Sequence, residues 1–571
     1  MIEKLFVLVV LASVVVLLVQ NRFKASLVFT GAVVVFYVFG FLDIKGWLLN
    51  YVNPSLVALM LLLLVAVVLE KSVFIRKLSQ GLVSRSYGHS LFKIGLFTSF
   101  TSAFLNNTAV VASLISSIKK NRFHLPSKLL LPLSFSAIFG GTLTLIGTST
   151  NLIVNGFVID RGLEPLGMFD FFYVGIFILF FGLLTLFATS RFLPNIEMRQ
   201  DNFQEYLIEA KVSKSSSLSG KTIEKAGLRN LEYLFLVEIQ RDGSILAPVG
   251  PRDVIKDGDI LVFSGDVKYV SLLKGFDGLK ISDEKISTKN IIEAIITPES
   301  NLVDTRVKNS NFRSKFNAAI IAIKRGDKNI KKIGDTVLKS GDKLILSTGS
   351  DFAKRDNIAQ NFYIISELKE DKLLSRSESY FAFFGFLVAV IAPSFFDISL
   401  VKSLLVLLIV FFLAGFLDIA QIKRRFPYEI VLIVGAAFGI ATVLIESGIS
   451  SSISTTISAL FGGFGVYGMF VCVYFLTLIL TEFVTNNAAV ALAFPIGYSS
   501  AISLGVDPMP FIFAVAYGAS ASFLTPYGYQ TNLMVASVAG YSVRDFARVG
   551  IFVSVIYSAC VLILTPLFFP F

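Results

Sequence analysis

The stretch Thr481-Glu-Phe-Val-Thr-Asn-Asn-Ala-Ala-Val-Ala-Leu-Ala-Phe-Pro495 is apolar enough for a membrane interior, yet it carries Thr485, Asn486 and Asn487 at its middle. Amides without partners are costly in hydrocarbon, so polar residues there usually face a cavity or a substrate path. A second copy of the pattern is Thr101-Ser-Ala-Phe-Leu-Asn-Asn-Thr-Ala-Val-Val-Ala112. Polar interruptions in both halves of a membrane protein are typical of a transporter's binding site.

Composition indicates a membrane protein that also contains a water-soluble segment. The 571 residues are 54% hydrophobic, and several apolar runs reach the roughly 18 residues that predict a spanning helix. Most charges fall between Asn195 and Leu374, which predicts a water-soluble insert. The net charge of +11 fits a positive-inside topology, so no nucleic-acid partner is expected. Cys472 and Cys560 lie in apolar runs, which supports neither a disulfide framework nor a cysteine metal site.

The first half reads as helices followed by two interrupted segments. The basic stretch Lys71–Lys93 predicts a cytoplasmic loop, so the amino terminus is expected outside. The segment Ile94–Ile118 has basic residues at both ends and is broken at Asn106-Asn107-Thr108, which predicts a re-entrant hairpin. Leu129–Phe157, interrupted at Gly140-Gly141-Thr142 and at Gly147-Thr-Ser-Thr-Asn151, predicts two half-helices. The other apolar runs are Leu5–Val19 (a retained helix and not a cleaved signal), Ala25–Leu42, Pro54–Leu69 and Phe169–Thr189.

The second half repeats this order with inverted topology. A hairpin at Val471–Ser500 is expected to enter from outside, and Phe511–Ala539 is again interrupted, at Gly518-Ala-Ser-Ala-Ser522 and at Thr525-Pro-Tyr-Gly-Tyr-Gln-Thr-Asn532. Asn107 and Asn151 are 44 residues apart, and Asn487 and Asn532 are 45 apart, which supports a duplication. The remaining runs are Tyr380–Phe396, Leu400–Ile419, Tyr428–Ile445 and Phe552–Leu567, and the carboxyl terminus is also expected outside.

The insert contains a repeat of its own. Gly258-Asp259 and Gly341-Asp342 lie 83 residues apart, each after alternating apolar residues that predict β-hairpins in small α/β domains. No Gly-x-Gly-x-x-Gly occurs there, so a Rossmann nucleotide site is not supported. The predicted domains are a first transmembrane repeat at 1–194, insert domains at 195–283 and 284–374, and a second, inverted transmembrane repeat at 375–571.

The polar residues indicate how a site could hold ions. Carboxamides and hydroxyls supply both donors and acceptors. Half-helix amino termini favour an anion, and freed carbonyl oxygens suit Na⁺. Neither copy of the pattern contains Lys, Arg or His, so an anion would depend on dipoles, amides and bound cations. Glu482 is the one acid, and it could be a structural partner or a proton site.

The two Asn-Asn patterns, with Gly147-Thr-Ser-Thr-Asn151 and Thr525-Pro-Tyr-Gly528, resemble the divalent anion:sodium symporter family of the ion transporter superfamily. The insert resembles two TrkA-C (RCK-C) domains. The family has Ser-Asn-Thr at each hairpin tip, and this chain departs from it in having Asn106-Asn107-Thr108 and Thr485-Asn486-Asn487. The resemblance covers essentially the whole chain.

The resemblance also implies roles for individual residues. Substrate would contact Asn107, Thr108, Asn486, Asn487, Thr525 and Pro526. One sodium site would use Ser102, Asn106, Asn107 and Gly147, and the other Thr481, Asn486 and Leu524. Supporting positions would be Thr148, Asn151, Thr485, Gly528 and Asn532.

The expected function is therefore sodium-coupled symport of a divalent oxyanion across a plasma (inner) membrane by alternating access, with sulfate as the first choice. Na⁺ is the only metal and no cofactor is expected, and no enzymatic activity is supported. Alternatives are a C4-dicarboxylate symporter, a cation/proton antiporter, an anion efflux permease, or a channel gated by the insert. The family resemblance implies a homodimer in the lipid bilayer. The insert domains would bind a small regulatory ligand or pack against a partner subunit.

Overall fold

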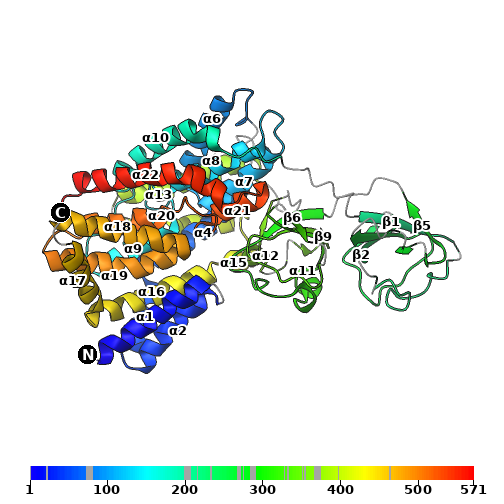
Figure 1. The fold of residues 1–571 in the computed structure, drawn as a ribbon, viewed down its shortest axis with the longest axis horizontal. Coiled ribbons are helices and arrows are strands. Elements are labelled where there is room, and N and C mark those ends of the chain that lie inside the picture. The colour runs from blue at the N-terminus through cyan, green and yellow to red at the C-terminus, as the bar shows by residue number, and fades with distance from the viewer. Residues whose placement is uncertain are drawn as a thin grey trace. The chain divides into compact units, whose positions relative to one another are not determined.

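The computed structural model comprises two compact units. It describes all residues except 1, 21–22, 73–80, 198–206, 215, 230, 232–233, 243, 266–269, 271, 274, 283–290, 327, 331–332, 350, 353–354, 356, 366–373, 397 and 462–464. The first unit is helical and comprises Met1–Asn195, Lys372–Val535 and Tyr541–Phe571. The second comprises Ile196–Asp371 and Ala536–Gly540 and is built on β-sheets (Figure 1).

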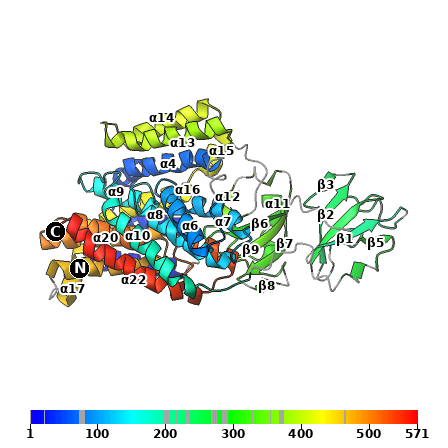
Figure 2. The ribbon, with the colours of Figure 1, turned by 90° about the horizontal axis from the view of Figure 1, so that it is seen from above.

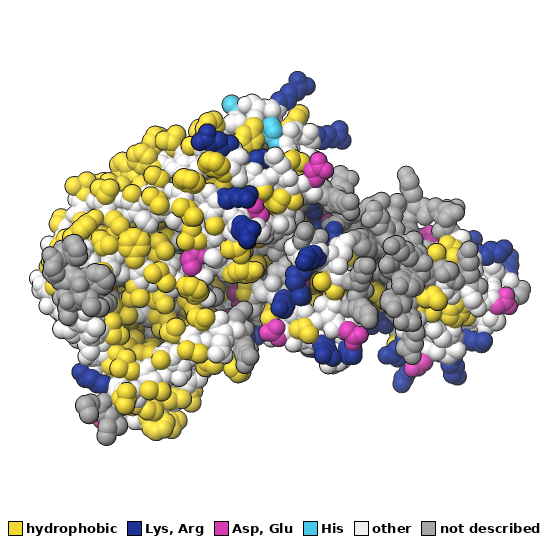
Figure 3. Space-filling view, in the orientation of Figure 1, with side chains coloured by type: hydrophobic (Ala, Val, Ile, Leu, Met, Phe, Trp, Pro, Cys, Tyr) yellow, Lys and Arg dark blue, Asp and Glu magenta, His cyan; other side chains and the backbone are white. Residues whose placement is uncertain are grey.

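Long apolar helices dominate the helical unit. Among the described residues, eight helices are long and apolar enough to cross a membrane. Hydrophobic side chains cover much of the visible surface over these helices (Figure 3), as expected of a surface that faces lipid. The first half contains α1 Ile2–Gln20, α2 Ala25–Val38, α3 Ile44–Leu49, α4 Pro54–Glu70, α6 Tyr87–Ser102, α7 Asn107–Lys119, α8 Leu130–Gly141, α9 Ser149–Asp160 and α10 Phe172–Thr189.

The second half follows the same order. Figure 2 shows α13 and α14 beside α4, a contact that joins the two halves. Capping boxes at Ser375 and Ser542 fix where α13 and α22 begin. The helices are α13 Arg376–Ile391, α14 Leu400–Leu413, α15 Ile419–Arg425, α16 Tyr428–Glu446, α17 Ile449–Phe461, α18 Gly465–Phe483, α19 Asn486–Leu504, α20 Met509–Ser520, α21 Gln530–Ala539 and α22 Val543–Phe568.

The predicted interruptions are present, but those placed at Gly140-Gly141-Thr142 and Gly518–Ser522 begin later than predicted, because α8 continues through Gly141 and α20 through Ser520. Hairpin 1 is α6 and α7, broken at residues 103–106, and hairpin 2 is α18 and α19, broken at 484–485. Joint 1 (142–148) separates α8 from α9, and joint 2 (521–529) separates α20 from α21. The arms α18 and α19 are themselves long enough to span a membrane, so length alone does not distinguish them from spanning helices. Membrane topology stays a prediction, and Arg76 and Lys77 of the basic loop lie outside the described residues.

Helix α17 was not predicted. Its sequence, Ile-Ser-Ser-Ser-Ile-Ser-Thr-Thr-Ile-Ser-Ala-Leu-Phe, is rich in hydroxyl residues, which are not strong helix formers. Tertiary packing stabilises it instead. Ser499 of α19 donates to Ser450 over 2.7 Å, and Ser454 and Ser503 lie 3.0 Å apart.

The second unit contains two five-stranded antiparallel sheets with the same strand order. Sheet 1 has the order β3-β2-β4-β1-β5, and sheet 2, written from the equivalent edge, has the order β8-β7-β9-β6-β10. A β-bulge recurs at Leu236/Glu238 and at Ile320/Ala322, so the duplication extends to local irregularities. The strands are β1 Leu207–Val212, β2 Leu234–Arg241, β3 Ser244–Leu246, β4 Ile260–Gly265, β5 Leu279–Ser282, β6 Ile291–Ile296, β7 Ala318–Arg325, β8 Lys328–Ile330, β9 Lys343–Thr348 and β10 Phe362–Ile364.

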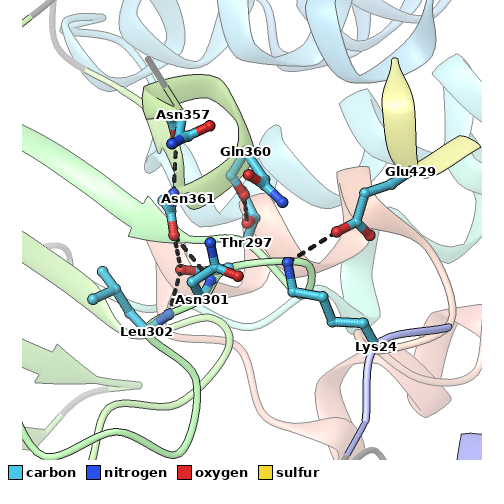
Figure 4. Close-up of polar contacts among 9 residues, drawn as sticks. Lys24, Thr297, Asn301, Leu302, Asn357, Gln360, Asn361 and Glu429 are labelled. Atoms are coloured by element: carbon cyan, nitrogen blue, oxygen red, sulfur yellow. Dashed lines mark hydrogen bonds and ion pairs between the residues drawn. The ribbon is translucent and has the colours of Figure 1, made fainter. Parts of the chain in front are cut away.

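The expectation of mixed α/β domains was only partly met. Within the described residues of Ile196–Asp371, the α-helices are the short α11 Phe312–Phe316 and α12 Ile358–Asn361, both in the second half of the insert. In that half, Asn361 ends α12 and its side-chain oxygen accepts from Ser300 Oγ and Asn301 N at 2.8 and 2.9 Å (Figure 4). The predicted boundary between the two insert domains falls within residues 283–290, outside the described residues.

Candidate functional site

The tips of the two hairpins begin their second helices in the same way. Asn106 caps α7 by accepting from Thr108 N over 2.8 Å, and Thr485 caps α19 by accepting from Ala488 N over 3.4 Å. The caps align Asn106 with Thr485, so Asn107 corresponds to Asn486 and Thr108 to Asn487. The two Asn-Asn pairs are therefore offset by one position between the repeats.

Asn107 is buried where hairpin 1 meets both joints. Its carboxamide fits best with the nitrogen donating to the carbonyls of Ala137 and Gly147, each at 3.3 Å, and the oxygen accepting from the Tyr529 hydroxyl at 2.6 Å. Gly141 leaves the space for this amide, since a Cβ there would lie 2.8 Å from Asn107 Nδ2. One predicted residue thus contacts joint 1 of its own repeat and joint 2 of the other.

Two further hydrogen bonds cross between the repeats at equivalent positions. Ser149, the first residue of α9, donates to Asn487 Oδ1 over 2.9 Å. Gln530, the first residue of α21, accepts from Thr108 Oγ1 over 3.0 Å. Each hairpin tip therefore binds the start of the second half-helix of the opposite repeat.

Two asparagines, one on α9 and one on α21, donate hydrogen bonds to backbone carbonyls in or next to the joint that precedes their helix. Asn151 Nδ2 donates to the carbonyls of Thr144 and Gly141, at 2.9 and 3.3 Å. Asn532 Nδ2 donates to the Ser522 carbonyl at 2.8 Å, and its oxygen accepts from Ser134 Oγ at 2.7 Å. Both asparagines are about 99% buried or more, and buried amides are costly unless bonded. These bonds therefore hold both joints in their unwound form.

The second hairpin is attached to α20 through Thr481 and to joint 2 through Glu482. Thr481 Oγ1 lies 2.9 Å from Asn486 Oδ1 and 2.7 Å from the Ala519 carbonyl. Glu482 Oε1 accepts from the backbone N–H groups of Phe523 and Leu524, each at 3.0 Å, and Oε2 accepts from Thr525 Oγ1 at 2.8 Å. Glu482 therefore orders joint 2, in agreement with the interpretation of a structural partner.

The remaining predicted residues lie in the same region, with two differences from expectation. The Thr525 hydroxyl is directed at Glu482, and the Asn106 oxygen caps α7. Ser102 is fully buried at the end of α6, and Thr148 precedes α9. Pro526 and Gly528 lie in joint 2. A Cβ at Gly528 would lie 2.2 Å from Ser522 Oγ, and one at Gly147 would lie 2.6 Å from the Gly141 carbonyl oxygen, so both joints require glycine.

Sequence reasoning missed Ser149, Tyr529 and Gln530 as individual positions. All three lie in the joint sequences that were singled out, and their polarity in an apolar context was the available signal. Their partners are 338 to 422 residues away, so only the tertiary structure identifies them.

The electrostatic consequence is a cluster of helix amino termini. The crossing bonds join these starts in two pairs, α9 with α19 and α7 with α21, and the amino terminus of a helix carries positive potential. The hairpin tips and joints contain no charged residue, and the acid that contacts joint 2 is Glu482 of α18. Such an arrangement can hold an anion by dipoles and amides, with oxygen ligands nearby for a hard cation.

Comparison with known proteins places the chain among transporters. The pattern of the citrate transporter family matches residues 6–518. A putative sulfur deprivation response regulator of Chlamydomonas reinhardtii is 30% identical, over 92% of this chain and 96% of its own length. Sodium/sulfate cotransporter 1 of the same alga is 29% identical over 61% of this chain and 41% of its own length. The uncharacterized transporter YfbS of Escherichia coli is 23% identical over the full length of both chains.

Proposed function

This chain belongs to the citrate transporter family, and on that premise we propose that it is a sodium-coupled symporter that imports a divalent oxyanion, sulfate first, by alternating access. The family and its relatives make it a multi-pass membrane transporter of anions and not an enzyme. The names of the algal sodium/sulfate cotransporters support sulfate and Na⁺ for this chain. We propose a plasma (inner) membrane location and a homodimer as well.

The observation that carries the proposal is the pair of crossing bonds, Ser149–Asn487 and Thr108–Gln530. They connect helix amino termini in two pairs, α9 with α19 and α7 with α21, without a permanent positive side chain. Sulfate bound there would meet no cationic side chain. Neutral dipoles alone compensate its two negative charges incompletely. Bound Na⁺ would supply the missing charge, which couples anion binding to sodium.

In this proposal Asn107, Thr108, Asn486 and Asn487 contact the anion, with Pro526 lining the pocket. Thr525 acts through Glu482, because its hydroxyl is donated to that carboxylate. The sodium sites use oxygen atoms of Ser102, Asn106, Asn107 and Gly147 on one side, and of Thr481, Asn486 and Leu524 on the other. The insert, proposed as two TrkA-C-like domains, would regulate transport.

The test is uptake of labelled sulfate into proteoliposomes under an inward Na⁺ gradient, with a K⁺ gradient of equal strength as the control. We expect uptake only with Na⁺, and strong loss in Asn487→Ala. Sulfate uptake that proceeds equally without Na⁺ would contradict the proposal.

A C4-dicarboxylate is the second candidate substrate, because the matching family is described as transporters of citrate, which is also a carboxylate anion. Carboxylates and sulfate offer similar oxyanion acceptors to helix amino termini. Competition of unlabelled succinate against labelled sulfate distinguishes them. Full displacement by succinate at much lower concentration than by sulfate itself would assign the dicarboxylate.

A further inference from the structure

The two sheets of the insert bury a shared apolar face, which we call the sheet interface. It consists of Leu207, Val237, Val262, Ile321, Ala322 and Ile345. The bulged residues Val237 and Ile321 occupy equivalent positions in β2 and β7, so the interface is pseudo-symmetric. Hydrogen bonds also cross it: Ser264 Oγ donates to the Ile321 carbonyl over 2.8 Å, and Ser347 Oγ donates to Glu238 Oε2 over 3.2 Å.

Glu238 breaks this symmetry. It is only 3% exposed, whereas the equivalent position in the second sheet is Ala322. Its other oxygen accepts from Gln240 Nε2 over 3.0 Å, so the carboxyl group has two neutral partners, Gln240 and Ser347. Burying a carboxylate with neutral partners is costly, and burial accordingly raises the pKa of Glu238.

Other charged groups occupy the same faces of the sheets. Strand register places Glu209 of β1 across Val262 from Glu238, and Glu293 of β6 beside Ile345. Glu293 lies 3.1 Å from Lys343 of β9, and both side chains are about nine-tenths buried. Among the described strand residues, the further charged groups on these faces are Lys211 of β1, Lys280 of β5 and Lys324 of β7.

We propose that Glu238 makes the sheet interface sensitive to protons, so that the two sheets pack together when Glu238 is neutral and separate when it is charged. The Ser347 hydroxyl can donate to a carboxylate or accept from a carboxyl, so this hydrogen bond is compatible with both forms. The desolvation cost differs between the two forms, because it falls on the charged form alone. Since the packed state raises the pKa, packing is fully stabilised below the ordinary glutamate pKa and is lost as pH rises through the raised value.

The experiment measures the distance between the two sheets in the full-length protein. Spin labels are attached at Lys225→Cys and Lys315→Cys, both exposed, in a chain carrying Cys472→Ser and Cys560→Ser. Distances are recorded by pulsed electron paramagnetic resonance from below the ordinary glutamate pKa of about 4.3 to well above neutral. We expect one narrow distance at low pH and a broader, longer distribution at high pH.

Variants identify the responsible group. Glu238→Gln and Glu238→Ala, the latter matching Ala322, should keep the narrow distance at every pH. Glu293→Gln and the exposed Glu224→Gln should broaden with pH as the parent chain does. A parent distribution that does not change with pH would overturn the proposal. Broadening that persists in both Glu238 variants, or that disappears in Glu293→Gln, would do so too.

Discussion

Ser149 and Asn487 lie 338 residues apart in the chain, and a 2.9 Å hydrogen bond joins them. The bond between Thr108 and Gln530 is its counterpart in the other repeat. Each bond joins a hairpin tip in one half of the helical unit to the start of a helix in the other half. If the proposed site lies at these bonds, both halves of the chain are needed to build it.

Removing a crossing bond should raise the KM for sulfate. Ser149→Ala deletes the donor to Asn487 and should raise the KM for sulfate roughly fivefold, since a typical net hydrogen bond contributes about 1 kcal/mol. Initial uptake rates in proteoliposomes measure this. Ser13→Ala, which removes an exposed hydroxyl of α1 that donates to the Val9 carbonyl, is the matched control. An unchanged KM in Ser149→Ala would separate this bond from the site.

Glu482 should act through position and not through proton transfer. Glu482→Gln keeps the shape of the side chain but replaces one acceptor oxygen by an N–H₂ donor. This donor would face a donor of joint 2, so the substitution should reduce the stability of the joint by about 1–3 kcal/mol. We expect lower sulfate uptake with the same dependence on pH as the parent protein. A flux driven by a pH gradient that disappears in Glu482→Gln would instead support cation/proton antiport.

Gly528 in joint 2 should not tolerate a side chain. A Cβ at Gly528 would lie 2.8 Å from the Thr481 carbonyl oxygen as well as close to Ser522. Gly528→Ala should therefore displace hairpin 2 from joint 2 and lower uptake at least tenfold. Gly31→Ala in α2 meets nothing within 4 Å and should transport normally. Normal uptake by Gly528→Ala would mean that joint 2 is not part of the site.

The insert is stabilised by two equivalent arginine–aspartate pairs. Arg325 binds Asp342 with both nitrogens at 2.7 and 2.8 Å, as Arg241 binds Asp259 at 2.7 Å, and both aspartate side chains are fully buried. Arg325→Lys loses the paired geometry and should destabilise its sheet by about 1–3 kcal/mol.

Hydrogen exchange of β9 amides in the intact protein measures this effect, with faster exchange expected in Arg325→Lys. Arg229→Lys is the control, because the Arg229–Glu224 pair is largely exposed and 3.5 Å long. Equal exchange in the two variants would show that the buried pair does not hold the sheet together.

Local signals made much of the site predictable. The breaks at Asn106-Asn107-Thr108 and Thr485-Asn486-Asn487 were found from their polarity, and the structure adds that Asn106 and Thr485 cap the helices that follow. The glycine-rich joints were visible because glycine and hydroxyl residues interrupt apolar runs. The strand duplication in the insert followed from its repeated Gly-Asp turns.

The partners across the repeats were not predictable, because they depend on how the two halves pack. Asn107 was assigned to substrate and sodium, but its contact with Tyr529 required the fold. The Thr525 hydroxyl was assigned to the anion pocket, whereas the nearby carboxylate of Glu482 takes it. Similarly, tertiary packing against α19 overrides the weak helix propensity of α17.

The coupling of the anion to Na⁺ at the crossing of the repeats is tested most directly by equilibrium binding of labelled sulfate to the purified protein. Binding is measured in Na⁺ and in K⁺ at equal ionic strength, so that screening is the same. The account predicts at least tenfold tighter sulfate binding in Na⁺, with the difference lost in Asn486→Ala. Equal sulfate affinity in the two salts would contradict it.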